Sequence, residues 1–96
     1  MLTLQDIRTK RESILTCARK HGAFRVRVFG SISRGDGTPG SDVDFLVQYE
    51  PQRSLLDHIS LIESLTSLLQ MPVDVVDETG LSPHLKAKIL SEAVPL

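Results

Sequence analysis

Two short stretches of the sequence, ten residues apart, carry residue types that can do chemistry together. The first is Gly30-Ser31, which follows an apolar run, and the second contains Asp42 and Asp44 at the start of another run. Because successive side chains of a strand point to opposite faces, two carboxylates one residue apart project from the same face. Like charges held that close repel each other unless a cation lies between them, and Mg²⁺ prefers oxygen ligands. The spacing therefore predicts a magnesium site at Asp42 and Asp44.

A third carboxylate occurs in a short apolar stretch further along the chain. Asp74 lies between Val73 and Val75, and a lone carboxylate in such a strand requires a reason, which a neighbouring metal site supplies. Asp77 is the competing candidate. It is expected to face the other way if the strand continues, and to belong to the following turn, so we assign Asp74 to the metal site.

Gly30-Ser31 is interpreted as the phosphate-binding part of the same site. A glycine has no Cβ to keep a ligand away from the backbone, and a serine at the start of a turn offers its hydroxyl and nearby N–H groups to phosphate oxygens. Each motif alone is common in proteins without this function. Their combination with a third strand carboxylate indicates nucleotidyl or phosphoryl transfer, and the sequence lacks the GxxxxGK[ST] pattern of a P-loop.

The pattern of apolar and turn-forming residues predicts the helices and strands that position these groups. In order, we expect a helix over 3–21, a strand over 24–29, a turn or short helix over 31–35, a strand over 42–49, a helix over 54–70, a strand over 73–76 and a helix from 82 or 83 to 91. This order predicts an α/β (α+β) fold in which a small mixed sheet of three to four strands is flanked by helices. We expect one domain over residues 1–96.

The same periodicities predict which faces are buried. On the strands the expected core residues are Phe24, Val26, Val28, Val43, Phe45 and Val47. On the first helix they are Ile7, Ile14, Leu15 and Ala18. On the middle helix they are Leu55, Ile59, Ile62, Leu65, Leu68 and Leu69. The last helix is marked by the apolar residues Leu85, Ile89 and Leu90.

Composition argues against several other classes of protein. The 96 residues are 41% hydrophobic with a formal net charge of -1, so no direct nucleic-acid binding is expected. No apolar run approaches the ~20 residues that span a bilayer, and no signal peptide is recognisable, so we expect a cytoplasmic protein without membrane association. The single cysteine, Cys17, fits a reducing compartment. The histidines, which lack metal-ligand spacing and are interpreted as surface or capping residues, are His21, His58 and His84.

The segment GSISRGDGTPGSDVDFLV resembles the motif of the DNA polymerase β-type nucleotidyltransferase superfamily. Within it, the chain is similar to the minimal nucleotidyltransferase (MNT) antitoxins, which act on HEPN-domain toxins. The resemblance spans nearly the whole chain, from the first helix to the VDVV strand, and implies a polymerase β palm-like fold. It also implies transfer of AMP from ATP to a tyrosine hydroxyl of the partner toxin, whose RNase activity is thereby blocked.

The resemblance implies a role for each residue of the motif. Asp42 and Asp44 would bind Mg²⁺, and Asp74 would complete the metal site and help activate the attacking hydroxyl. Gly30 and Ser31 would hold the terminal phosphates of ATP. The arginine of the GSxxRG segment, which would steady the loop or contact phosphate, is Arg34.

Two other functions stay open at this point. One is an antitoxin that neutralises its toxin by binding alone, and the other is nucleotidyl transfer to a small molecule or an RNA end. Because aromatic residues that could stack on a base make up only 4% of the chain, a partner chain is expected to complete the pocket. The expected docking surface is an apolar patch on the last helix, formed by Leu85, Ile89, Leu90 and Val94.

Overall fold

The computed structural model of this protein describes residues 2–96. The helices over these residues are α1 (Leu4–Thr9), α2 (Arg11–Lys20), α3 (Gly30–Arg34), α4 (Leu55–Leu69), the 3-10 helix η1 (Glu78–Gly80) and α5 (Pro83–Glu92). The strands are β1 (Ala23–Phe29), β2 (Val43–Tyr49), β3 (Val73–Asp77) and β4 (Val94–Pro95). Within the described range, no helix is both long and apolar enough to cross a membrane.

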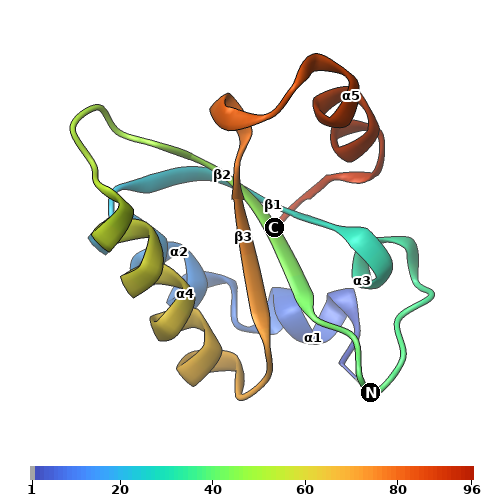
Figure 1. The fold of residues 1–96 in the computed structure, drawn as a ribbon. Helices are drawn as coiled ribbons and strands as arrows, with labels where there is room; N and C mark the ends of the chain where they lie inside the picture. Colours follow the sequence, from blue (N-terminus) through green and yellow to red (C-terminus); the bar gives the residue numbers. More distant parts are fainter. Residues whose placement is uncertain (1) are drawn as a thin grey trace.

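The strands form one mixed sheet in the order β3-β2-β1-β4. β1 is antiparallel to both β2 and β4, whereas β2 and β3 run parallel, with α4 as the crossover between them. Figure 1 shows α2 and α4 lying together beside the sheet, and α5 on the other side near α3. The predicted fold class, a small mixed sheet flanked by helices, is confirmed.

The main core lies between one face of the sheet and the helices α1, α2 and α4. Val43, Phe45 and Val47 point into it, as their alternation predicts, and each is at most 1% exposed. The helices contribute Ile7 and Ile14 from α1 and α2, and from α4 a row of residues four apart, Leu61, Leu65 and Leu69.

A second, smaller apolar cluster lies on the opposite face of the sheet. Phe29 of β1, Leu46 of β2 and Ile89 of α5 are its buried members. It packs α5 against the sheet, on the face that also carries Asp44, because Asp44 and Leu46 are two residues apart in β2.

The predicted first helix is wrong in one respect, since it is two helices that meet at Lys10. A capping box between Thr3 and Asp6 starts α1, and the backbone N–H of Lys10 closes it on the carbonyl of Ile7. The break has no Gly or Pro to mark it. Ile7 and Ile14 reach the same core from the two separate helices.

The predicted buried face of the middle helix is also wrong at its beginning. Leu55 is 71% exposed and Ile59 42% exposed, whereas Leu61 is fully buried. Apolar residues occupy two adjacent faces of α4, and only the face that contains Leu61 and Leu65 meets the sheet. Periodicity alone could not choose between those faces.

β1 departs from strict alternation near its beginning. The register with β2 shifts between Phe24 and Arg27, and Arg25 has a φ of 53°, so the chain bulges there. As a result, Phe24 is exposed and Ala23 takes the buried position at the start of the strand. The prediction that Phe24 faces the core is therefore wrong.

The C-terminal segment differs from the predicted docking patch. Ile89 is buried against the sheet, and Val94 belongs to β4, where it pairs with Val28 and packs on the main core. Leu85 and Leu90 remain exposed on α5. The four residues therefore do not form one apolar surface, and β4 is a strand that the sequence did not predict.

The histidines lie at three different kinds of position. His21 caps the C-terminal end of α2, and His84 is exposed in the first turn of α5, as expected for capping or surface residues. His58 is half-buried, and its Nδ1 lies 2.7 Å from the hydroxyl of Tyr49. The surface interpretation of His58 is therefore wrong.

Two leucines of α4 test the assignment of its buried face. Leu61→Ala should lower the free energy of unfolding by about 3 kcal/mol, because it leaves a cavity in the main core. Leu55→Ala, in the same helix and with the same change of side chain, should alter it by less than about 0.5 kcal/mol. Urea unfolding followed by circular dichroism measures both, and equal losses would contradict the assignment.

Candidate active site

Asp44 and Asp74 face each other across the two parallel strands of the sheet. In the register of β2 and β3, Asp44 pairs with Asp74, and on its other side Asp44 pairs with Phe29 of β1. Residues paired across neighbouring strands project from the same face, so the two carboxylates are neighbours. Parallel pairing through α4 thus brings together two aspartates thirty positions apart in the chain.

Asp42 precedes the first residue of β2 and is exposed, as is Asp74, whereas Asp44 is half-buried. Burial, and then the negative charges of Asp74, Asp42 and Glu92, raise the pKa of Asp44 to about 6, against a smaller lowering effect of Arg34. The three predicted aspartates therefore lie close enough to repel one another electrostatically. Asp77, the competitor, is on the opposite face and accepts hydrogen bonds from Thr79 in η1, as predicted.

Gly30 lies directly against Asp44. It has a φ of 77°, in the left-handed region that favours glycine, and a Cβ at this position would collide with Oδ2 of Asp44. β1 ends at Phe29, which pairs with Asp44 of β2, and α3 begins at the next residue, Gly30. The chain therefore turns directly beside Asp44. Gly30 is thus required both for the turn and for the close approach of backbone and carboxylate.

Glu92, at the end of α5, is a site residue that the sequence analysis missed. Its Oε1 accepts a hydrogen bond from the backbone N–H of Gly30 at 3.1 Å. Arg34 Nη1 donates to both carboxylate oxygens of Glu92, at 3.1 and 3.0 Å, and Arg34 Nε donates to Asp36 at 3.2 Å. A glutamate near the C-terminal end carries no motif, and only the packing of α5 places it here.

The two serines of α3 have different positions. Ser31, the predicted phosphate ligand, is half-buried in the first turn of α3, and its carbonyl accepts the backbone N–H of Asp36. Ser33 donates its hydroxyl to the backbone carbonyl of Glu92. Ser33 thereby fastens the end of α5 to α3, which is a structural role that its position in the motif did not reveal.

A buried ion pair fixes α5 over this face of the sheet. Glu78 of η1 is 8% exposed and pairs with Arg27 of β1, and this hydrogen bond lowers the pKa of Glu78. Lys86 of α5 lies 3.7 Å from the other oxygen of Glu78. Since a buried carboxylate is costly without a partner, these contacts hold η1, α5 and β1 together.

The three carboxylates suit a divalent cation in their donor atoms and charge, although they are not arranged as a complete coordination site. Asp42, Asp44 and Asp74 offer hard oxygen donors, and their mutual repulsion is what a cation would relieve. Among residues 2–96, however, no three acidic, histidine or cysteine side chains are arranged as a ready ligand set. Asp42 and Asp74 are exposed, so packing does not hold their side chains in one rotamer.

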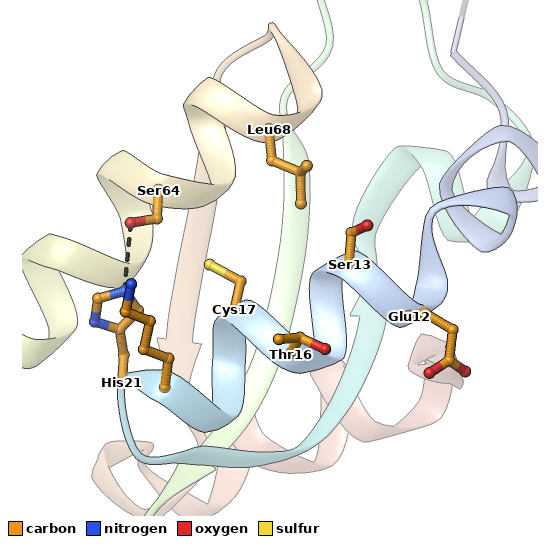
Figure 2. A pocket seen from close by; sticks show the side chains of 8 residues that line it. Glu12, Ser13, Thr16, Cys17, His21, Ser64 and Leu68 are labelled. Atoms are coloured by element: carbon orange, nitrogen blue, oxygen red, sulfur yellow. Dashed lines mark hydrogen bonds between the residues drawn. The ribbon is translucent and has the colours of Figure 1, made fainter.

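A hollow of about 510 Å³ between α2 and α4 has different chemistry. Figure 2 shows Cys17 pointing toward α4 beside the hydrogen bond between His21 and Ser64, which spans 3.3 Å. Burial raises the pKa of the Cys17 thiol, so it is protonated at neutral pH and is not an activated nucleophile. Asp44 and its neighbours do not line this hollow.

Comparison with known families shows to which family the chain belongs. The family described as "Nucleotidyltransferase domain" matches residues 10–96, a range that contains Gly30 and all three aspartates. The chain belongs to this family. The nucleotidyltransferase domain is also 41% identical, over 98% of its length and 96% of the relative's, to a protein of Thermococcus cleftensis named protein adenylyltransferase MntA.

Solved structures agree with this family. One assigned to the minimal nucleotidyltransferases matches the nucleotidyltransferase domain with a TM-score of 0.88 and 47% identity, over 99% of this chain and 97% of that one. A mutant of the MntA-HpeT toxin-antitoxin complex matches with a TM-score of 0.73 and 26% identity, over 90% of this chain and 70% of that one. The resemblance drawn from the GSISRGDGTPGSDVDFLV segment is thereby confirmed for family and fold.

Two glycines with the same backbone conformation test the contact between Gly30 and Asp44. Gly30→Ala should destabilise the nucleotidyltransferase domain by about 1–2 kcal/mol and also abolish ATP binding, because the new Cβ displaces Asp44. Gly35→Ala is the matched control, since Gly35 has a φ of 81° and no described atom lies within 4 Å of a Cβ there. It should cost about 1 kcal/mol while leaving ATP binding unchanged. Calorimetric titration and urea unfolding measure the two effects, and loss of binding in both variants would contradict the assignment.

Asp44 should give the domain a characteristic dependence of stability on pH. Its folded pKa of about 6 lies above the ordinary aspartate value of 3.8, so the folded state binds the extra proton and stability falls as pH rises through this window. Asp44→Asn removes this loss and should stabilise the metal-free protein by about 1 kcal/mol near pH 7, a figure discounted for partial exposure. The difference should shrink toward zero at about pH 3.5.

Urea unfolding in chelator at several pH values checks this expectation. Glu63→Gln, which neutralises an exposed carboxylate on α4, serves as the control and should show no such pH-dependent gain. If Asp44→Asn raised the free energy of unfolding by the same amount at every pH, the stabilisation would not come from the ionisation of Asp44.

Proposed function

We propose that this protein is an antitoxin that transfers AMP from ATP to a tyrosine hydroxyl of a HEPN-domain toxin. The observation that carries the proposal is the in-register pairing of Asp44 with Asp74 directly beside Gly30. The carboxylates and the glycine turn assigned to phosphate binding thus lie together, as nucleotidyl transfer requires. The relative named protein adenylyltransferase MntA and the likeness to the MntA-HpeT toxin-antitoxin complex support the acceptor and the partner.

In this proposal Asp42, Asp44 and Asp74 hold Mg²⁺, which when bound neutralises phosphate charge and orients the α-phosphate. Gly30, Ser31 and Arg34 bind the terminal phosphates of ATP. The half-buried position of Asp44 at the base of the site, with exposed carboxylates on either side, fits metal binding from the solvent side. A cytoplasmic location, where ATP and a toxin are both present, belongs to the same proposal.

The residues of the chain then account for the proton and the leaving group. The tyrosine oxygen attacks the α-phosphorus, the bond from that phosphorus to the bridging oxygen breaks, and pyrophosphate leaves. The phenolic proton passes to the carboxylate of Asp74, which is exposed at the sheet edge and accessible to a side chain from a second protein. Arg34 stabilises charge that develops on the leaving pyrophosphate.

A second candidate is an antitoxin that acts by binding alone. It is favoured by one observation, that in the described part of the chain the three carboxylates are not already arranged to hold an ion. Nucleotidyl transfer to a small molecule or an RNA end is the remaining alternative, and the family match applies to it equally. The experiment below separates the three.

The test is incubation with ATP labelled in the α-phosphate, Mg²⁺ and a HEPN-domain toxin. Wild type should label the toxin, and Asp42→Ala/Asp44→Ala should lower the rate at least about a hundredfold, because phosphate charge loses its counter-ion. Glu63→Gln on the exposed side of α4 should retain full activity. Labelling at the wild-type rate by the double variant would refute the site assignment.

The same incubation distinguishes the alternatives. If neither protein labels the toxin and both still block its RNase activity, neutralisation is by binding. If label appears in RNA or in a small molecule rather than in the toxin, the chain is a nucleotidyltransferase with another acceptor. Mass spectrometry of the labelled toxin identifies the modified residue.

A further inference from the structure

The carboxylate of Glu92 is bound to Gly30 and Arg34, the residues assigned to the phosphates of the nucleotide. Both carboxylate oxygens of Glu92 accept hydrogen bonds from Arg34 Nη1, and Oε1 also accepts the backbone N–H of Gly30. The donors are those of a phosphate site, a guanidinium and a backbone amide beside it. The arrangement is therefore competent to bind an anion, with Glu92 filling it.

We propose that Glu92 is an internal competitor of the nucleotide. In the nucleotide-free protein it occupies Gly30 and Arg34, and it withdraws when a triphosphate binds. The inference rests on the proposed function, since it takes ATP as the ligand and these two residues as its phosphate contacts. It adds that nucleotide binding must displace a residue outside the Gly-Ser and Asp-x-Asp motif.

The two anions cannot both accept the backbone N–H of Gly30. The backbone N–H of Gly30 is a single donor, and it points at Glu92 in this structure. A triphosphate brought beside Glu92 would also be repelled by its charge, in a site that already contains Asp42, Asp44 and Asp74. Binding of polyphosphate to the Gly30 N–H and the contact of Glu92 with that N–H are therefore mutually exclusive.

Rotation of the Glu92 side chain alone is sufficient to open the site. Its backbone is held in place, because its carbonyl accepts the hydroxyl of Ser33 and the next residues form β4 against β1. Arg8 Nη2 also donates to the carbonyl of Pro95 at 2.8 Å. The Glu92 side chain is 21% exposed, so its carboxylate has a path to solvent while α5 and β4 stay where they are.

Arg34 keeps a partner after Glu92 leaves. Its Nε donates to Asp36 in the following loop at 3.2 Å, on a different nitrogen from the one that holds Glu92. Asp36 can therefore hold the guanidinium in place while Nη1 turns from Glu92 to a phosphate oxygen. This division of contacts makes Asp36 a suitable comparison for Glu92.

The effect of the competitor should depend on whether the ligand carries phosphates. Adenosine has no group to replace the carboxylate on Gly30 and Arg34, so it gains nothing from displacing Glu92. A triphosphate or inorganic tripolyphosphate replaces both contacts. Glu92 thus lowers the apparent affinity of every ligand that uses the phosphate site. It leaves the affinity of a ligand that binds elsewhere unchanged.

The experiment compares dissociation constants of ATP, tripolyphosphate and adenosine for wild type, Glu92→Gln and Asp36→Asn, by calorimetry with Mg²⁺ and without toxin. Glu92→Gln should bind ATP and tripolyphosphate about five- to tenfold more tightly, as expected if the carboxylate occupies the site most of the time. Adenosine binding should not change. Asp36→Asn removes one negative charge and one contact of Arg34 but leaves Glu92 on Gly30, and should change ATP affinity by less than about twofold.

Equal or weaker ATP binding by Glu92→Gln would overturn the proposal and make Glu92 a support for Arg34. An equal gain in Asp36→Asn would also overturn it, because the effect would then be one of net charge. Glu92→Asp keeps the charge but shortens the side chain by one methylene, so it should tighten ATP binding as well if Glu92→Gln does not fold. Because toxin is absent, these binding constants test the competitor alone. The proposed function is tested separately by the labelling experiment with toxin, so tighter ATP binding here together with no labelling there would uphold the competitor and refute only the proposed function.

Discussion

The repulsion between Asp44 and Asp74 is the constraint around which the site is arranged. The parallel register of β2 and β3 sets two carboxylates side by side, and burial of Asp44 together with the negative charge of Asp74 raises the pKa of Asp44. Replacing Asp44 should therefore stabilise the metal-free fold near neutral pH. Keeping both is a cost to the fold that a bound cation and its nucleotide would offset.

Two contacts of α5 with the rest of the chain complete this arrangement. The buried Glu78 ties η1, Arg27 and α5 together, and Glu92 joins the end of α5 to Gly30 and Arg34. Positive groups at the site are thus paired internally while the aspartates are not. The metal-free protein therefore has a negative centre and an occupied anion site, two features that Mg²⁺ and ATP would reverse together.

Much of the fold could be predicted because local patterns were unambiguous. Alternation in β2 placed Val43, Phe45 and Val47 in the core, and turn-forming residues marked most element ends. The errors arose where local patterns permit two outcomes. Leu55 and Leu61 are equally apolar, and which one is buried depends on where the sheet meets α4, while the exposure of Phe24 depends on a bulge with no residue to mark it.

The sequence by itself determined the composition of the site: a glycine and serine after one strand, two aspartates entering the next, and Asp74 on a third. These are local facts, because alternation and spacing along a strand fix which side chains share a face. Only the tertiary structure decided that Asp44 faces Asp74, since pairing between strands is not encoded at short range. It alone brought Glu92 to Gly30, across sixty-two positions of chain, because a glutamate acquires that role only through the packing of its helix.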